Sequence, residues 1–183
     1  MHSSRYFFAL WPNPIVARQL AGLQTHLPPH ARLLHCADFH LTLAFLGELP
    51  VSAEPTLLDI LDTVPFSGVE LVIDRIDVFQ RIGVTWAGPS TIPRALQNLY
   101  GDLSVLLDER QIWFDRYHGF QPHLTLARKT RMTPYSLKAP VMWWADRLVL
   151  ACSGIHANDQ VPSSEPMPRY RVIAQRGVHV ARS

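Results

Sequence analysis

Cysteine is scarce in this chain, and its scarcity excludes two kinds of stabilising framework. Only Cys36 and Cys152 occur among 183 residues, and neither belongs to a C-x-x-C pair. Two isolated thiols build neither a disulfide scaffold nor a zinc knuckle, because both depend on several cysteines at short, regular spacing. The sequence therefore predicts a protein of the reducing cytoplasm whose two thiols are inert.

Long apolar runs and a large net charge are also missing. The apolar run at residues 6–11 is interrupted by Pro12 and Pro14, so it is too short for the core of a signal peptide. Nowhere do about 18 apolar residues follow one another, which is the length that a membrane-spanning helix needs. The formal charge of +2 is too small to indicate nucleic-acid binding, although a pI near 8.7 agrees with a phosphate-bearing ligand. We expect a soluble protein that does not contact a membrane.

What the chain does contain is one tetrapeptide twice. HLTL occupies residues 40–43 and again residues 123–126. Successive side chains of a β-strand point to opposite faces, so in each copy the histidine and the threonine share one face and the two leucines share the other. Buried leucines would leave each imidazole beside a hydroxyl at the edge of a cleft. We expect two such strands to bring two histidines to one site.

Local patterns predict both strands and helices around these motifs. We expect strands at residues 5–10, 69–73 with 76–78, 83–87, 122–127, 148–151 and 170–174, and an extended region at residues 32–46 that Gly47 ends. Along residues 69–73 the alternation puts apolar side chains on odd-numbered positions, whereas Ile76 and Val78 fall on even-numbered ones. This change predicts a β-bulge near residues 74–75. We expect helices at residues 14–25 and 53–62, capped by Asn13 and Ser52. A third, long helix follows a cap at Ser90 or Thr91, has Pro93 in its first turn, and carries its apolar residues from Leu96 to Leu107.

This order of elements predicts an α+β fold. Each half of the chain holds strands, a helix and one HLTL strand, with hairpins in place of regular βαβ alternation. We expect one domain over residues 1–183, bilobal, with two pseudo-symmetric lobes of mostly antiparallel sheet and packed helices around a central cleft. Each lobe contributes one HLTL strand.

Two imidazoles in one cleft supply a proton acceptor and a proton donor near neutral pH. A threonine beside each of them suits a tetrahedral phosphate that is held from both sides, which indicates acid–base cleavage of a phosphodiester. A single H-x-T-x on a strand is a weak signal, but a second copy with the same leucines is hard to ascribe to chance. Zinc is the competing use of histidine, and neither motif has another ligand at short spacing. We expect no metal and no cofactor.

The doubled HLTL is similar to the paired His-x-Thr-x signature of the two-histidine phosphoesterases. Within that superfamily the chain resembles the bacterial and archaeal RNA 2′,3′-cyclic phosphodiesterases, also called 2′-5′ RNA ligases. Residues 5–10, 39–47 and 122–128 carry the resemblance, together with Tyr170. The resemblance extends over nearly the whole chain, and the doubled motif is a specific signal for this superfamily.

The resemblance implies an enzyme that opens a terminal 2′,3′-cyclic phosphate of RNA and leaves a 2′-phosphate. By that analogy His40 is the proton donor to the leaving 3′-oxygen, and His123 is the proton acceptor that activates water. Thr42 and Thr125 would bind the phosphate, and Arg128 would neutralise its charge. The two motif copies are too alike for the sequence alone to assign the acid and the base.

Arg128, Lys129, and either Phe7 or Phe8 are candidates for substrate binding. In an unbroken strand Arg128 has the parity of the buried leucines, so it reaches the cleft only if the strand ends or bulges near Ala127. Lys129 has the parity of His123 and is the alternative cation. Phe7 or Phe8 would stack on the terminal base, unless both pack in the core.

The sequence therefore predicts a metal-independent hydrolase that acts as a monomer in the cytoplasm. Its partners would be RNA ends or small nucleotides that carry a 2′,3′-cyclic phosphate. Reversible 2′-5′ RNA ligation fits the same site, because joining a 5′-hydroxyl to a cyclic phosphate needs no ATP. Two alternatives are a non-catalytic RNA- or nucleotide-binding module and a phosphodiesterase for another cyclic nucleotide. Intact histidines and threonines in both motifs argue against a module that only binds.

Overall fold

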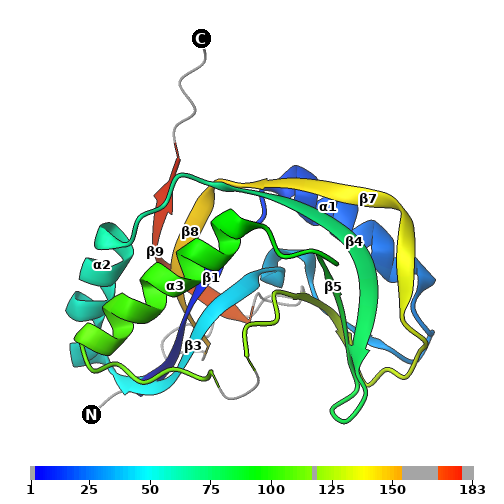
Figure 1. The fold of residues 1–183 in the computed structure, drawn as a ribbon. Helices are drawn as coiled ribbons and strands as arrows, with labels where there is room; N and C mark the ends of the chain where they lie inside the picture. Colours follow the sequence, from blue (N-terminus) through cyan, green and yellow to red (C-terminus); the bar gives the residue numbers. More distant parts are fainter. Residues whose placement is uncertain (1–2, 117–118, 154–168, 179–183) are drawn as a thin grey trace.

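A computed structural model of the chain describes residues 3–116, 119–153 and 169–178 (Figure 1). Within these ranges the strands are β1 (Ser3–Leu10), β2 (Arg32–Leu33), β3 (Leu41–Pro50), β4 (Val69–Phe79), β5 (Val84–Gly88), β6 (Leu124–Arg128), β7 (Tyr135–Ala145), β8 (Arg147–Ser153) and β9 (Tyr170–Gly177). The helices are α1 (Pro14–Leu23), α2 (Glu54–Thr63) and α3 (Arg94–Glu109), and the 3-10 turns are η1 (Gln24–His26), η2 (Cys36–Asp38) and η3 (Val51–Ala53). No helix of the described residues is both long and apolar enough to cross a membrane.

One antiparallel sheet runs through the molecule and confirms the expected α+β class. Its strands follow the order β7-β4-β5-β6-β3-β1-β8-β9, and β2 pairs with β6. The two HLTL strands, β3 and β6, are neighbours at the centre and meet at a single residue pair, Leu41 with Leu124. Each side of this junction combines segments from both halves of the chain, because β1 and β3 lie with β8 and β9, and β4 and β5 lie with β6 and β7. In Figure 1, α2 and α3 lie on the half formed by β3, β1, β8 and β9, whereas α1 lies near β7.

The first helix begins as its sequence predicts. The side chain of Asn13 accepts hydrogen bonds from the backbone N–H groups of Ile15 and Val16, both at 3.0 Å, and Pro14 is the first helical residue. These bonds satisfy two of the donors that a helix start leaves unpaired. The predicted cap is confirmed.

The other two predicted caps are wrong, because neighbouring structure replaces them. Ser52 lies inside η3, which leads directly into α2 without a side-chain cap. Ser90 instead bonds to the carboxylate of Asp74, with its backbone N–H at 2.7 Å and its hydroxyl at 2.5 Å. Helix α3 starts after Pro93, also without a side-chain cap. The bulge expected near residues 74–75 is present in β4, where the pairing with β7 shifts between Ile73 and Arg75.

The extended region predicted at residues 32–46 is divided in the structure. It consists of β2, the turn η2 and the first part of β3, and β3 continues to Pro50. Gly47 therefore does not end the strand. It has a φ of +71° and lies at a β-bulge, where the pairing of β1 with β3 shifts. Glycine adopts this positive φ without a steric penalty because it has no Cβ.

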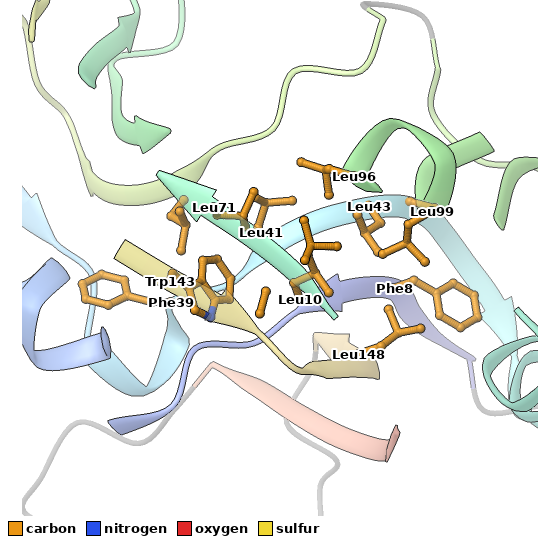
Figure 2. Packing of buried hydrophobic residues seen from close by; sticks show 14 of the residues in the cluster. Phe8, Leu10, Phe39, Leu41, Leu43, Leu71, Leu96, Leu99, Trp143 and Leu148 are labelled. Carbon is orange, nitrogen blue, oxygen red and sulfur yellow. The ribbon is translucent and has the colours of Figure 1, made fainter. Parts of the chain in front are cut away.

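The leucines of both motifs lie in one hydrophobic core. Leu41, Leu124 and Leu126 have no exposed surface and Leu43 is 4% exposed. Figure 2 shows two of them among side chains of β1, β7 and α3. Burial of the leucines turns the opposite face of β3 and β6 outward, as the alternation predicts.

Candidate active site

His40 and His123 line one cavity of about 740 Å³ together with Thr42 and Thr125. Each histidine directly precedes its strand, because β3 begins at Leu41 and β6 begins at Leu124. Counting outward from the pair Leu41–Leu124, an antiparallel register brings each histidine opposite the threonine of the other motif. The central strand pair thus gathers both motif copies at one site.

Both imidazoles are held in the same way. The Nδ1 atom of His40 lies 2.7 Å from the carbonyl oxygen of Asp38, and that of His123 lies 2.7 Å from the carbonyl oxygen of Gln121. A carbonyl oxygen only accepts, so Nδ1 carries the hydrogen in both rings. This leaves Nε2 of each histidine as the nitrogen that exchanges a proton with a ligand.

Aromatic rings surround His40 on several sides. The ring centroids of Phe7, Trp11 and Tyr170 lie 4.9, 5.2 and 4.8 Å from its centroid, and the Trp11 ring is stacked on it. Burial lowers the pKa of His40 to about 4, although the Asp38 carbonyl opposes this. The charges of His123 and Arg128 lower this pKa further. His40 is therefore neutral at pH 7 when the site holds no anion.

Aromatic rings also lie against His123, but they are two where His40 has three. Phe79 lies edge-on at 5.0 Å between ring centroids, and Trp86 lies at 5.9 Å. Burial lowers the pKa of His123 as well, against the effect of its bond to the Gln121 carbonyl. Each histidine is thus flanked by one phenylalanine and one tryptophan, which exclude water from the proton-transfer groups.

A β-bulge brings Arg128 to the cavity. Thr85 pairs with Ala127 and Trp86 pairs with Thr125, so Leu126 is an extra residue in β6. The bulge reverses the parity of the strand, and Arg128 therefore lies on the face of Thr125 and lines the cavity. This is the bulge near Ala127 on which the predicted position of Arg128 depended.

The same bulge occurs in the other copy of the motif. Phe8 pairs with Ala44 and Ala9 pairs with Thr42, so Leu43 is the extra residue in β3. Phe45 thereby takes the position that Arg128 has in β6, and it lines the cavity with 39% of its surface exposed. The sequence interpretation missed Phe45. Aligning HLTLAF of residues 40–45 with HLTLAR of residues 123–128 would have found it.

Two of the proposed substrate contacts lie elsewhere. Phe8 has no exposed surface and points into the core, where Figure 2 shows it beside Leu148, so it cannot stack on a base. Phe7 lines the cavity but is only 2% exposed and packs on His40. Lys129 follows the end of β6 with a φ of +57° and is not among the residues that line the cavity. The bulge in β6 moves the cationic position from Lys129 to Arg128.

Asp38 is a second residue that the sequence interpretation missed. Its side chain is 2% exposed, and one carboxylate oxygen accepts the backbone N–H of Arg169 at 2.8 Å. Burial raises the pKa of this carboxyl, while the backbone N–H groups of Arg169 and Tyr170 oppose the rise. Asp38 therefore joins the start of β9, which carries Tyr170, to the turn that holds His40. No local pattern in the sequence marks this pairing across the chain.

The charge of the cavity favours an anion. Its charged lining residues are Arg5, Arg128, Arg169 and Glu48, and Glu48 accepts a hydrogen bond from the Ser3 hydroxyl. Three cations against one anion attract a phosphate. In the part of the chain that the structure describes, no three His, Cys, Asp or Glu side chains gather to hold a metal ion.

Comparisons with known proteins identify the family and the fold. Residues 10–86 match the family model described as LigT like Phosphoesterase. The chain is 35% identical over 126 residues to the RNA 2′,3′-cyclic phosphodiesterase of Escherichia coli strain K12. The aligned region is 68% of this chain and 71% of that protein. A crystal structure described as a phosphoesterase superposes with a TM-score of 0.82 at 24% identity, over 97% of this chain and 99% of that one. The E. coli LigT structure in apo form gives 0.80 at 24% identity, with the same coverage.

Proposed function

The chain belongs to the LigT-like phosphoesterase family, and from this premise we propose that it hydrolyses the 2′,3′-cyclic phosphate at an RNA end to a 2′-phosphate. We expect RNA ends or small nucleotides with such a phosphate as substrates, and a monomer as the active form, since both histidines come from one chain. The similarity to the E. coli RNA 2′,3′-cyclic phosphodiesterase supports this substrate class. We also expect the reaction to take place in the cytoplasm.

One observation carries the proposal. Two imidazoles line one cavity, and each is fixed at Nδ1 by the carbonyl two residues before it, so that each offers Nε2 to a ligand. A ligand that binds between them meets two proton-transfer groups at once. That arrangement suits a reaction in which one oxygen loses a proton while another gains one.

The phosphate is the group that the rest of the cavity suits. The hydroxyls of Thr42 and Thr125 line it beside the histidines, and Arg128 supplies a positive charge. Hydroxyl donors and a guanidinium stabilise the negative charge that builds on phosphate oxygens in the transition state. Phe45, at the position equivalent to Arg128, offers an exposed ring on which the terminal base stacks.

The proton transfers then follow from these positions. Nε2 of His123 takes a proton from water, the water oxygen attacks phosphorus, and the bond from phosphorus to the 3′-oxygen breaks. His40 gives the leaving 3′-oxygen a proton from Nε2, so the product has a 2′-phosphate and a 3′-hydroxyl. His40 must be protonated for this step. The anionic phosphate supplies the favourable charge that raises the pKa of His40 from its low value in the empty site.

A product analysis tests the proposal. An oligoribonucleotide that ends in a 2′,3′-cyclic phosphate is incubated with the protein in EDTA, and the end group is identified. We expect a 2′-phosphate, and we expect His40→Ala and His123→Ala each to lose about 10²-fold or more of the rate. Val105→Ala, at an exposed position of α3, is the control that keeps the activity. Hydrolysis that survives either histidine substitution, or that EDTA abolishes, would contradict the mechanism.

A further inference from the structure

Glu48 is the only acid among the described residues that line the cavity of the two histidines. Arg5, Arg128 and Arg169 line the same cavity and attract a phosphate, whereas a carboxylate repels one. An acid at this site lowers the affinity for the anion, so its presence indicates a second group on the ligand, one that donates hydrogen bonds. The position of Glu48 in the cavity indicates which group this is.

A second bulge in β3 turns Glu48 toward the cavity. Phe7 pairs with Phe45, whereas the residue before it in β1 pairs with Gly47. Leu46, between these two partners, is therefore an extra residue in β3. In an unbroken strand Glu48 would lie on the face opposite Phe45, and the extra residue places both on the same face. Both side chains line the cavity, as this parity requires.

Cross-strand pairs give the direction in which a ligand lies. Three pairs follow one another on the cavity face of β1 and β3: Ala9 with Thr42, Phe7 with Phe45, and Arg5 with Glu48. The first and third pairs are four residues apart in β1, or about 14 Å along an antiparallel strand. A nucleotide whose phosphate lies at Thr42 spans this interval, with its base on Phe45 and the far edge of the base at Glu48. The cavity volume of about 740 Å³ has room for a whole nucleotide.

The polar groups at this end of the cavity match the Watson–Crick edge of guanine. That edge carries the carbonyl oxygen O6 beside two donors, N1–H and the amino group at C2. A carboxylate accepts two hydrogen bonds side by side, and a guanidinium donates. No ion pair joins Arg5 to Glu48 among the described residues, so both are available to a ligand. The Ser3 hydroxyl donates a hydrogen bond to the Glu48 carboxylate and orients it.

We propose that Glu48 determines base specificity by accepting hydrogen bonds from N1–H and the 2-amino group of a terminal guanine that stacks on Phe45. Arg5 donates to O6 of the same base. This inference rests on the proposed function, because it names the substrate of the same cavity. Adenine offers Glu48 one amino group beside an acceptor nitrogen, and uracil offers one N–H between two carbonyl oxygens. Glu48 therefore favours RNA that ends in guanosine 2′,3′-cyclic phosphate.

Hydrolysis of the 2′,3′-cyclic phosphates of guanosine, inosine and uridine tests the proposal. The reacting phosphate is the same in all three, and inosine differs from guanosine only in lacking the 2-amino group. We expect kcat/KM to fall about tenfold from guanosine to inosine, because Glu48 loses one charged hydrogen bond, and to fall further for uridine. In Glu48→Gln the amide keeps one acceptor and replaces the other with a donor. The preference for guanosine over inosine should then shrink to about twofold or less.

Glu70→Gln is the matched control, because it removes the same charge elsewhere. Glu70 is an exposed residue of β4 and is not among the described residues that line the cavity. This variant should keep the ratio of the wild type for every pair of substrates. Ser3→Ala should lower the ratio of guanosine to inosine by less than Glu48→Gln does, since the carboxylate remains and loses only the hydroxyl that orients it. Folding of every variant is checked by its melting temperature.

The outcomes separate the two proposals. If the wild type hydrolyses all three cyclic phosphates with equal kcat/KM, Glu48 does not read the base, and the proposed hydrolysis stands. If Glu48→Gln changes kcat/KM for all three by the same factor, Glu48 acts on the phosphate or on the fold, which also overturns the inference and leaves the hydrolysis intact. A wild type that hydrolyses none of the three would refute the proposed function and this inference with it.

Discussion

The low pKa values of His40 and His123 make a prediction about the pH dependence of the reaction. Hydrolysis requires His40 protonated and His123 neutral, and burial brings both pKa values below 6.5, that of His40 to about 4. The profile of kcat/KM reports the pKa values of the free enzyme, so its optimum should lie below pH 6.5. Above the higher of the two pKa values, the protonated fraction of His40 falls about tenfold for each pH unit.

The measurement uses adenosine 2′,3′-cyclic phosphate, whose single phosphate charge does not change between pH 5 and pH 8. We expect kcat/KM to fall steadily from pH 6.5 to pH 8. An optimum at pH 7 or above would show that His40 is not a buried acid of depressed pKa in the free enzyme.

The buried carboxylate of Asp38 leads to a second prediction about a single residue. Its carboxylate holds the start of β9, whose Tyr170 packs edge-on against His40. Removing the carboxylate in Asp38→Ala leaves the N–H of Arg169 without its acceptor, and a lost bond to a charged group costs about 1.5–3 kcal/mol. We expect kcat to fall about tenfold with little change in KM, since Asp38 positions His40 and does not line the cavity.

Asp38→Asn is the matched control for this prediction. Its amide oxygen still accepts the N–H of Arg169, so we expect most of the activity to remain and the pH profile to keep its shape. A parallel loss in both variants, or a large rise in KM, would contradict a role in positioning.

Residue positions were predictable only where the periodicity of the strand was intact. The alternation placed His40 and Thr42 on the face opposite the buried leucines. It could not decide between Arg128 and Lys129, because one extra residue in a strand reverses all later parities, and Leu126 is that residue. Phe8 was misassigned for a related reason: in a strand that is buried on both faces, adjacent aromatic residues do not reveal which of them lies toward the cavity.

At the scale of elements, close packing of β5 against the segment before β6 positions His123. A Cβ atom added to Gly88 would lie 2.8 Å from the carbonyl oxygen of Pro122 and 2.8 Å from the Trp86 ring. Gly88→Ala should therefore push the backbone that leads into His123. We expect a loss of about 1–3 kcal/mol in the free energy of unfolding and a fall in kcat of about tenfold or more.

Gly101→Ala is the control, measured by urea unfolding and steady-state kinetics alongside Gly88→Ala. Gly101 lies inside α3, and nothing is within 4 Å of an added Cβ. Alanine in a helix interior is favoured over glycine by about 0.5–1 kcal/mol, so this variant should gain stability and keep its activity. A stable and fully active Gly88→Ala would contradict the role of this contact.

Most elements were predictable from local patterns, but the strand β7 was not, and neither were the exact ends of the elements. The cap at Asn13 acts through hydrogen bonds to its own helix, so the sequence contains the whole interaction. Ser90, a predicted cap of α3, instead gives its hydrogen bonds to Asp74 of β4, and α3 starts after Pro93. Partners that are distant in the chain decide such ends, and no window of sequence contains them.

At the scale of the molecule, the duplicated motif explains why one sheet carries one site. Among the described residues, β6, β5, β4 and β7 lie on one side of the junction between β3 and β6, with β2 also paired to β6, and β3, β1, β8 and β9 lie on the other. Each side supplies one histidine and one threonine. The repeat predicted that the two motifs would meet, and both histidines and both threonines line one cavity. It did not predict that the two motif strands would be neighbours in one sheet, since strand order depends on contacts between distant segments.

The same buried histidines couple the stability of the whole molecule to pH. Burial lowers the pKa of His40 from 6.5 to about 4, whereas the unfolded chain binds this proton at the ordinary pKa. Between pH 6.5 and pH 4 the unfolded state therefore holds more protons, and stability is lost as the pH falls. For His40 this loss is about 2 kcal/mol between pH 7 and pH 5. His123 acts in the same direction, and the raised pKa of Asp38 acts in the opposite one near pH 4.

Urea unfolding at pH 7 and pH 5 measures this coupling. We expect the free energy of unfolding of His40→Gln to change by about 2 kcal/mol less than that of the wild type, because glutamine has no proton to gain. His26→Gln, at an exposed histidine of η1, should behave as the wild type does. If His40→Gln loses as much stability as the wild type on acidification, the imidazole of His40 is not buried in its neutral form. The pKa of His40 would then not be depressed by burial, and the phosphate would not be needed to raise it for proton donation.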